Sequence, residues 1–214
     1  MKMIEDVYDE YYIMPELRNH MDRVASVAGC ICDNFMSPID KKSVIIACLL
    51  HDMGNIIKFD LNKFPEFNEP KGIEYWEAVK NNFIAKYGND VHKASIDIGL
   101  ELGVSLRVLE ILNSIGFGKS VDVYNSNDFE KMICIYSDMR VTPHGIVSLK
   151  ERLADLESRY SQNPNAKKGK ELQDIYLALY SIEEKIFNNT KITPNEINDE
   201  VYNQSVLLLR KSFI

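Results

Sequence analysis

The sequence predicts an all-α protein. Apolar residues recur at alternating spacings of three and four along several segments, which is typical of amphipathic helices, and no segment is an obvious strand. We expect eight or nine helices. A chain of 214 residues with 45% hydrophobic residues can bury a substantial core in one domain, or in one domain with a helical extension.

Two helices are expected first. One runs from about Pro15 to Met36, and a proline suits its first turn. Asp40 is placed to cap a second helix, in which residues 44–50 are apolar nearly all round, so this helix should be buried on most sides. Gly54 then ends or distorts it. The buried face of the first helix consists of Leu17, Met21, Val24, Ala28, Ile31 and Phe35.

The middle of the chain combines helices with an aromatic loop. Residues 59–72 contain two prolines and three phenylalanines without helical spacing, which predicts a loop that can form one wall of a pocket. Three helices follow, at Ile73–Tyr87, after the cap Asp90, and at Ser105–Leu112. Residues 113–127, rich in Gly, Ser and Asn, include no convincing strand.

Helix-start motifs organise the C-terminal part. After a turn at residues 142–145, Ser148 to Glu151 form a capping box that opens a helix to about Tyr160. Asn163–Pro164 starts another amphipathic helix, and Thr193 to Glu196 form a second capping box. We therefore divide the chain into a domain at residues 1–160 and a C-terminal helical extension at 161–214, which packs on the bundle or forms a homodimer.

Charge and composition exclude several classes of function. Lys and Arg number 25 against 32 Asp and Glu, a net charge of −7, so the chain lacks the footprint of a general nucleic-acid or anionic-membrane binder. Any anionic ligand needs a local cationic pocket or a metal. The first 15 residues do not resemble a signal peptide, no apolar run approaches 18 residues, and the four cysteines lie in apolar runs as reduced core residues. The expected location is cytoplasmic.

Polar residues interrupt this helical frame at three places. His51 and Asp52 directly follow the apolar run IIACLL, Asp138 follows MICIY, and His20 borders the buried face of its helix. Burying such groups is costly unless each has a partner. Imidazole and carboxylate ligands without thiolate favour a five- or six-coordinate ion over a closed structural zinc. A helix cap at the doublet and a salt bridge at Asp138 are the alternative interpretation.

In the order H, HD, D, these residues resemble the metal-binding signature of the HD-domain phosphohydrolase superfamily. The surrounding sequences HMDRVASVA, LLHDMG and YSDMRV are similar to those that flank the first histidine, the doublet and the last aspartate in that family. The resemblance spans about residues 17–141, more than half of the chain.

The resemblance implies an HD-domain helical bundle with one divalent metal ion per chain, Mn, Fe, Co, Ni or Mg. It implies a metal-dependent phosphohydrolase that uses metal-activated water to hydrolyse a small phosphorylated metabolite or nucleotide. His51 and Asp52 are then catalytic, and the metal ligands are His20, His51, Asp52 and Asp138. General metal chemistry independently supports the hypothesis of phosphate hydrolysis, because a metal ion with open coordination positions polarises phosphoryl oxygens and lowers the pKa of bound water.

The sequence departs from the family pattern in two places. Many members read HD-x-G-K, whereas Asn55 replaces the lysine here, so that a phosphate contact is lost or taken over by Lys58. Members with two metals carry two more histidines; His92 is similar to the first, but residues 113–116 (NSIG) lack the second. We therefore expect one ion, with His92 contacting water or phosphate.

Other residues near these motifs are candidates for substrate binding. Arg23 and Arg140 are close in sequence to metal ligands, and a guanidinium fork suits phosphate, although either residue can instead pair with an acid. The full set of expected substrate contacts is Arg23, Lys58, His92 and Arg140. Lesser candidates are Lys150 and Arg152 at a pocket rim, Glu69, Glu74 and Glu77 as a general acid, and Phe59, Phe64 and Phe67 as nucleobase contacts or loop anchors.

Two alternatives to hydrolysis stay open. Asn55 in place of lysine favours an HD-fold sensor or scaffold that binds a nucleotide without cleaving it. A redox-active di-iron oxygenase is the other alternative, and it would need the second histidine that residues 113–116 lack.

Overall fold

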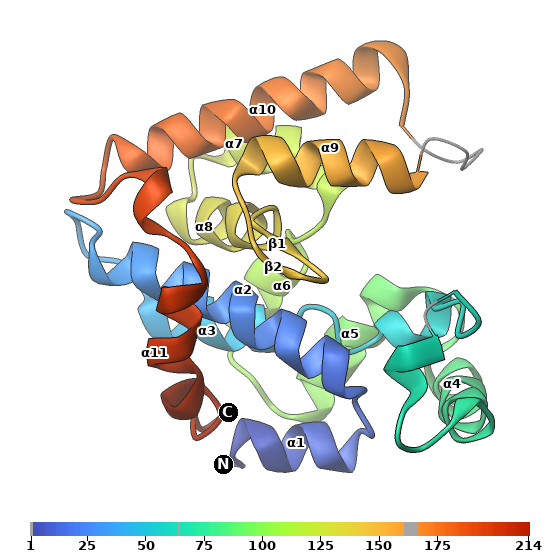
Figure 1. The fold of residues 1–214 in the computed structure, drawn as a ribbon. Coiled ribbons are helices and arrows are strands. Elements are labelled where there is room, and N and C mark those ends of the chain that lie inside the picture. Colours follow the sequence, from blue (N-terminus) through green and yellow to red (C-terminus); the bar gives the residue numbers. More distant parts are fainter. Residues whose placement is uncertain (1, 64, 161–166) are drawn as a thin grey trace.

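The computed structural model describes residues 2–63, 65–160 and 167–214. It confirms the all-α class: within these residues, the chain forms eleven α-helices and one small two-stranded hairpin, which lies beside α2 and α9 (Figure 1). The α-helices are α1 (Ile4–Glu10), α2 (Pro15–Asp33), α3 (Lys41–Leu50), α4 (Ile73–Tyr87), α5 (Val91–Glu101), α6 (Leu106–Leu112), α7 (Ser120–Ser126), α8 (Phe129–Asp138), α9 (Leu149–Tyr160), α10 (Gly169–Phe187) and α11 (Asp199–Leu209). Short 3₁₀ turns are η1 (Asn55–Lys58), η2 (Pro65–Asn68), η3 (Phe117–Lys119) and η4 (Pro194–Glu196), and the strands are β1 (Val141–Thr142) and β2 (Gly145–Ile146).

The core is built around α3. Every residue from Ser43 to Leu50 is buried, as the continuous apolar run predicts. Helix α3 packs against α2, α6 and α8, and α2 also contacts α8 and α11. Helices α2, α3 and α8 therefore meet at the centre of the bundle. Helices α2 and α8 each carry one of the polar motifs, and α3 immediately precedes the third.

Capping groups set most helix boundaries where the sequence predicts them. The Asp40 carboxylate accepts a hydrogen bond from the Ser43 backbone N–H at 3.1 Å, and Asp90 accepts from the N–H groups of His92 and Lys93. At the start of α9, the Ser148 N–H donates to Glu151 at 2.8 Å and Ser148 Oγ accepts from the Glu151 N–H, which completes the predicted capping box.

The structure differs from the predicted helices in two details. The count of eight or nine omits α1 and α7, which are only seven residues long and lack a strong periodic signal. Helix α2, predicted to end at about Met36, ends at Asp33, and Phe35 pairs with Thr190.

The second capping box, Thr193 to Glu196, forms as predicted. It opens the 3₁₀ turn η4; extended Ile197 then enters the core, and α11 starts with Asn198 as its cap.

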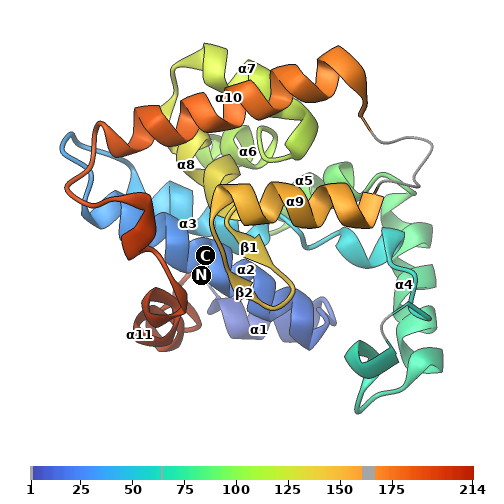
Figure 2. The same ribbon diagram turned by 45° about the horizontal axis from the view of Figure 1, so that its top comes forward.

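The last two helices cover different parts of the bundle (Figures 1 and 2). Helix α10 packs on α7 and α8, and α11 lies along α2. Asn163–Pro164, the predicted start of the first of these helices, lies outside the described residues. The domain boundary between residues 160 and 161 and the homodimer stay predictions.

An ion pair between a buried carboxylate and a partly exposed guanidinium joins the end of α11 to α2. Asp22 is fully buried and accepts a hydrogen bond from Arg210 Nε at 2.9 Å. Burial raises the pKa of Asp22 above its ordinary value, against the opposite effect of the Arg210 guanidinium. The carboxylate thus depends on a cation from the C-terminal helix.

Replacing Arg210 by Leu should lower the free energy of unfolding by about 2 to 4 kcal/mol, because it leaves a buried carboxylate without its cation. Adding Asp22→Asn to this variant should recover part of the loss, since a neutral amide is cheaper to bury. Urea denaturation measures both effects. Lys211→Leu, at an exposed neighbouring position, is the matched control, and an equal loss in this variant would contradict the assignment.

Candidate metal centre

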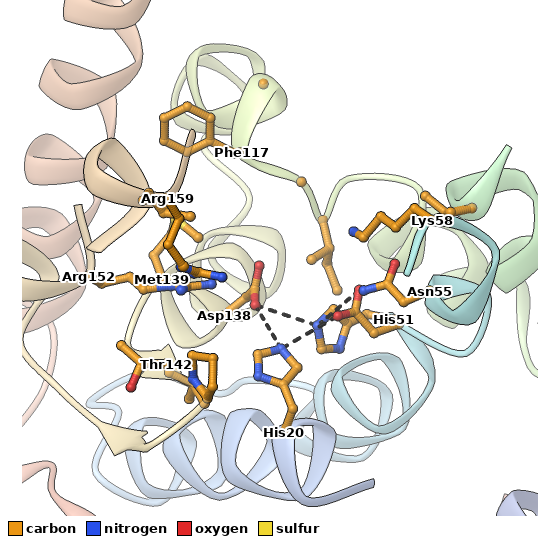
Figure 3. A pocket seen from close by; sticks show the side chains of 18 of the residues that line it. His20, His51, Asn55, Lys58, Phe117, Asp138, Met139, Thr142, Arg152 and Arg159 are labelled. Carbon is orange, nitrogen blue, oxygen red and sulfur yellow. Dashed lines mark hydrogen bonds and ion pairs between the residues drawn. The ribbon is translucent and has the colours of Figure 1, made fainter. Parts of the chain in front are cut away.

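The four polar residues that the sequence singles out converge on one point (Figure 3). His20 comes from α2, the doublet His51–Asp52 follows the last residue of α3, and Asp138 is the last residue of α8. His20 Nε2 lies 3.2 Å from Asp138 Oδ1 and 3.6 Å from Asp52 Oδ2. His51 Nε2 lies 3.6 Å from both Asp52 Oδ1 and Asp138 Oδ1.

These separations suit a shared cation. Nitrogen and oxygen ligands about 2.0 to 2.2 Å from one ion lie about 3 to 3.6 Å from each other. The side chains are between 3% and 21% exposed, so the cluster is sheltered but open on one side. His20, His51 and Asp52 alone already present ligand atoms that all lie within 4.8 Å of one another.

The hydrogen bonding of His51 is the most direct indication that a metal ion fits this cluster. Its Nδ1 lies 2.8 Å from the Cys48 carbonyl oxygen, so a proton on Nδ1 is donated to that oxygen and the lone pair is left on Nε2. Nε2 is buried and has no hydrogen-bond partner among the described residues. A buried, unpaired imidazole nitrogen facing two carboxylates is the arrangement that a divalent ion would satisfy.

The electrostatics of the cluster favour positive charge. Burial by itself lowers the pKa of His51, but the carboxylates of Asp52 and Asp138 outweigh this effect and raise the pKa to about 10. Burial likewise opposes ionisation of Asp138, yet His20 and His51 hold the pKa of that carboxyl well below its usual range. Without a metal, His51 is therefore an imidazolium at neutral pH, with a second proton on Nε2. Only loss of this proton leaves the lone pair that a metal would use.

Gly54 shapes the turn that carries the doublet, although not through an unusual backbone conformation. Its φ of −84° is available to any residue. A Cβ at this position would collide with the Val91 carbonyl oxygen of α5 and lie 2.8 Å from the Ala94 Cβ. The Gly54 N–H also donates to Ser95 Oγ at 3.0 Å. The glycine thus lets α5 pack directly behind the doublet.

A cavity of about 930 Å³ opens over the cluster. Its size is that of a site for a complete small molecule rather than for one phosphate ion. Aromatic side chains from the predicted loop and from η3 and α10 line it, namely Phe59, Phe67, Phe117 and Tyr176. Phe117 packs edge to face against Tyr176, with ring centroids 6.3 Å apart. Phe64 lies outside the described residues.

Three of the four predicted substrate contacts line this cavity. Arg23 does so with its guanidinium over the Tyr202 ring of α11, 5.1 Å from the ring centroid. Lys58 is exposed and extends toward the doublet from η1 (Figure 3). Asn55, which stands where many family members have lysine, is buried in the wall. His92 is the third contact.

Arg140 is not placed in the cavity, so its prediction as a phosphate contact was wrong. It is 3% exposed, and its guanidinium donates to Tyr136 Oη at 2.7 Å, to the Ile197 carbonyl at 3.0 Å and to the Val147 carbonyl. These bonds attach α8 to the segment before α11. Proximity in sequence to Asp138 does not bring Arg140 to the cavity, because its guanidinium is held by Tyr136 and by the backbone carbonyls of Val147 and Ile197.

The carboxyl groups predicted as a general acid also lie elsewhere. Among described residues, Glu69, Glu74 and Glu77 do not line the cavity over the cluster, whereas Glu16 and Glu157 do. Arg152 reaches the cavity as expected, but Lys150 does not. Four cationic residues in the wall were missed by sequence analysis: Lys119, Arg159, Lys167 and Lys168.

Lys119 links His92 to the segment at residues 113–116, which lacks the second histidine of two-metal family members. The Lys119 ammonium donates to His92 Nε2 at 2.9 Å and also to the Asn113 carbonyl oxygen. Burial lowers the pKa of Lys119 from its ordinary value. His92 Nε2 is thus engaged by a cation, which opposes the use of this nitrogen as a ligand for a second metal.

Comparison with known families agrees with this geometry. The HD domain family model matches residues 17–94, which include His20, His51 and Asp52. The resemblance inferred from the motifs is therefore confirmed over this segment, which ends before Asp138, the fourth residue of the cluster. HD domains indicate the superfamily of metal-dependent phosphohydrolases. Searches of curated proteins and of solved structures gave no significant match. No helix in the described part of the chain has the length and apolarity to cross a membrane.

Metal binding should release about one proton at pH 7, because the metal-free protein holds a proton on His51 and a ligand imidazole must be neutral. Since the pKa of His51 lies near 10, affinity for Mn²⁺ should rise with pH from 6 to 8.5, by up to about tenfold per pH unit. Calorimetric titration in buffers with different ionisation enthalpies counts the protons. Release of none would show that His51 is not a ligand.

We predict one tightly held ion per chain. Because the Lys119 ammonium donates to Nε2 of His92, His92→Ala should leave the metal content of dialysed protein at one equivalent. Elemental analysis makes this measurement, with Asp138→Ala as the comparison that should lose the ion. Two equivalents falling to one in His92→Ala would establish a dinuclear centre instead.

Proposed function

We propose that this protein is a metal-dependent phosphohydrolase that acts on a small phosphorylated metabolite or nucleotide. The observation that carries the proposal is the unpaired, buried Nε2 of His51, which faces two carboxylates and a second imidazole at the floor of a large cavity. At 3.6 Å from each carboxylate oxygen, this nitrogen makes no hydrogen bond with the described residues, and the separation leaves room for a metal ion between the three groups.

The metal would be held by His20, His51, Asp52 and Asp138. When bound, it would supply a Lewis acid that polarises the phosphoryl group and lowers the pKa of a water molecule to near neutrality. Asp52 has its two oxygens toward different histidines and is the residue we assign to take up the proton of the attacking water. The water oxygen forms the new bond to phosphorus, the ester P–O bond breaks, and the proton passes to the leaving oxygen.

Other side chains of the cavity bind and orient the substrate. Lys58 offers an ammonium group that has no partner among the described residues, and Arg23 and Lys119 add positive charge. These cations provide the local attraction that an acidic chain needs for an anionic substrate. The aromatic wall suits the apolar or planar part of a metabolite and is consistent with a nucleobase.

His51→Ala and Asp52→Ala should each abolish phosphate release and remove stoichiometric metal, while helical circular dichroism stays largely unchanged because the apolar core does not depend on the ion. The assay follows phosphate release from nucleotides and phosphomonoesters with Mn²⁺, Co²⁺ or Ni²⁺. Lys150→Gln, outside the cavity, is the control for a change of surface charge. Metal-loaded protein that turns over no substrate in the panel would overturn the proposal.

A nucleotide-binding sensor is the second candidate, favoured by one observation. Asn55 is buried in the cavity wall and places a short, neutral amide beside the doublet, where many relatives carry lysine. Calorimetry distinguishes the two functions: nucleotide binding to the metal-loaded protein without phosphate release would support the sensor.

A further inference from the structure

Two arginines of α9 form an assembled cationic group in the cavity wall. Arg152 Nη1 donates to Asp155 Oδ2 at 2.7 Å. Arg159 donates to both oxygens of the same carboxylate, from Nε to Oδ1 at 2.9 Å and from Nη2 to Oδ2 at 2.6 Å. One carboxylate thus orients two guanidinium groups, and the group as a whole keeps a positive charge.

The burial of Arg152 is difficult to explain by stability alone. Its side chain is only 10% exposed, and its buried Nε has no hydrogen-bond partner among the described residues. A buried charge with an unsatisfied donor is destabilising, and an apolar side chain of similar size would cost less. An anion bound in the cavity would compensate the charge, and guanidinium groups suit phosphate oxygens.

The arginines lie apart from the other candidate phosphate contact. In Figure 3, Arg152 and Arg159 lie beside Met139 on one side of the metal cluster, and Lys58 and Asn55 lie on the other. A phosphoryl group at the metal can be bound from the Lys58 side. The arginine pair faces a different part of the cavity, where it can contact another part of the same molecule.

The charge of the whole wall agrees with this separation. Among the described residues, seven Lys and Arg line the cavity, and once a divalent ion balances Asp52 and Asp138, the only acids of this part of the chain that oppose them there are Glu16 and Glu157. Asp155 and Glu171, which pair with cations of the wall, neutralise two more. The remaining excess of about three positive charges exceeds the charge of a phosphomonoester dianion and matches that of an organic diphosphate.

We propose that Arg152 and Arg159 bind a second phosphate group, so that the substrate is an organic diphosphate, such as a nucleoside diphosphate, rather than a phosphomonoester. This proposal rests on the proposed function, because it assumes that the first phosphate is bound at the metal. Both arginines lie outside the segment that matches the HD domain, so that the selecting residues belong to a different part of the chain from the matched metal-binding residues.

The test measures binding, so it does not depend on turnover. Methylphosphonate and methylenediphosphonate, which resist hydrolysis, are titrated calorimetrically into Mn²⁺-loaded wild type, Arg159→Gln, Arg152→Gln and Lys150→Gln. Lys150 lies on the same helix but does not line the cavity, so its variant is a matched control for loss of one positive charge. The side chain of Arg159 is 27% exposed, and its variant carries the test if Arg152→Gln fails to fold.

Wild type should bind the diphosphonate at least about tenfold more tightly than the monophosphonate. Arg159→Gln should weaken diphosphonate binding by about ten- to a hundredfold, as expected for a charge-assisted contact, and change monophosphonate binding less than about twofold. Lys150→Gln should change neither. Equal losses for both probes, or no loss for either, would overturn the proposal.

The phosphate-release assay separates this proposal from the proposed function. The binding pattern above without any hydrolysis would support the arginine site and overturn the phosphohydrolase. Hydrolysis of monophosphates with equal binding of both probes would support the phosphohydrolase and overturn the arginine site.

Discussion

Two imidazoles and two carboxylates lie within 3.2 to 3.6 Å of their nearest neighbours at the point where three largely apolar helices meet. Such groups are expensive to bury unless they share charge. In this protein the negative potential of Asp52 and Asp138 is strong enough to raise the pKa of a completely buried imidazole to about 10. The requirement for a cation at this point constrains the rest of the bundle, because each contributing helix must end, turn or pack so that its polar group reaches the same small volume.

The helices satisfy this requirement by local means. Helix α3 ends at Leu50, which allows the adjacent His51 and Asp52 to reach the cluster together, although successive residues of a continuous helix diverge by about 100°. The following turn is held from behind by α5, whose backbone approaches so closely that only glycine fits at position 54. The hydrogen bond from His51 to the Cys48 carbonyl fixes the ring tautomer. Packing, helix termination and protonation state are therefore coupled at one doublet.

Sequence analysis predicts those features that local chemistry determines. Caps such as Asp40 and Ser148 place helix ends, the apolar run before His51 identifies the buried helix, and the order of polar motifs identifies the cluster. Features that depend on tertiary contacts are missed. Helix α7 is short and is stabilised by packing against α10. The Arg140 guanidinium donates to the backbone carbonyl of Ile197, which is distant in sequence. Lys119 contacts His92 only in the folded chain.

The two parts of the cavity have different origins. The floor consists of the four residues that we propose as metal ligands: His20 on α2, the doublet His51–Asp52 directly after α3, and Asp138 at the end of α8. Helices α9 and α10 and the turn η3 instead supply the cationic and aromatic wall, with Arg152, Lys119, Phe117 and Tyr176. Helix α11 contributes indirectly, because Tyr202 stacks on Arg23 and Arg210 compensates Asp22 on the same helix as His20. Under the proposed function, substitutions in the wall would therefore change substrate selection without disturbing the proposed metal ligands, because the two sets of residues lie on different elements.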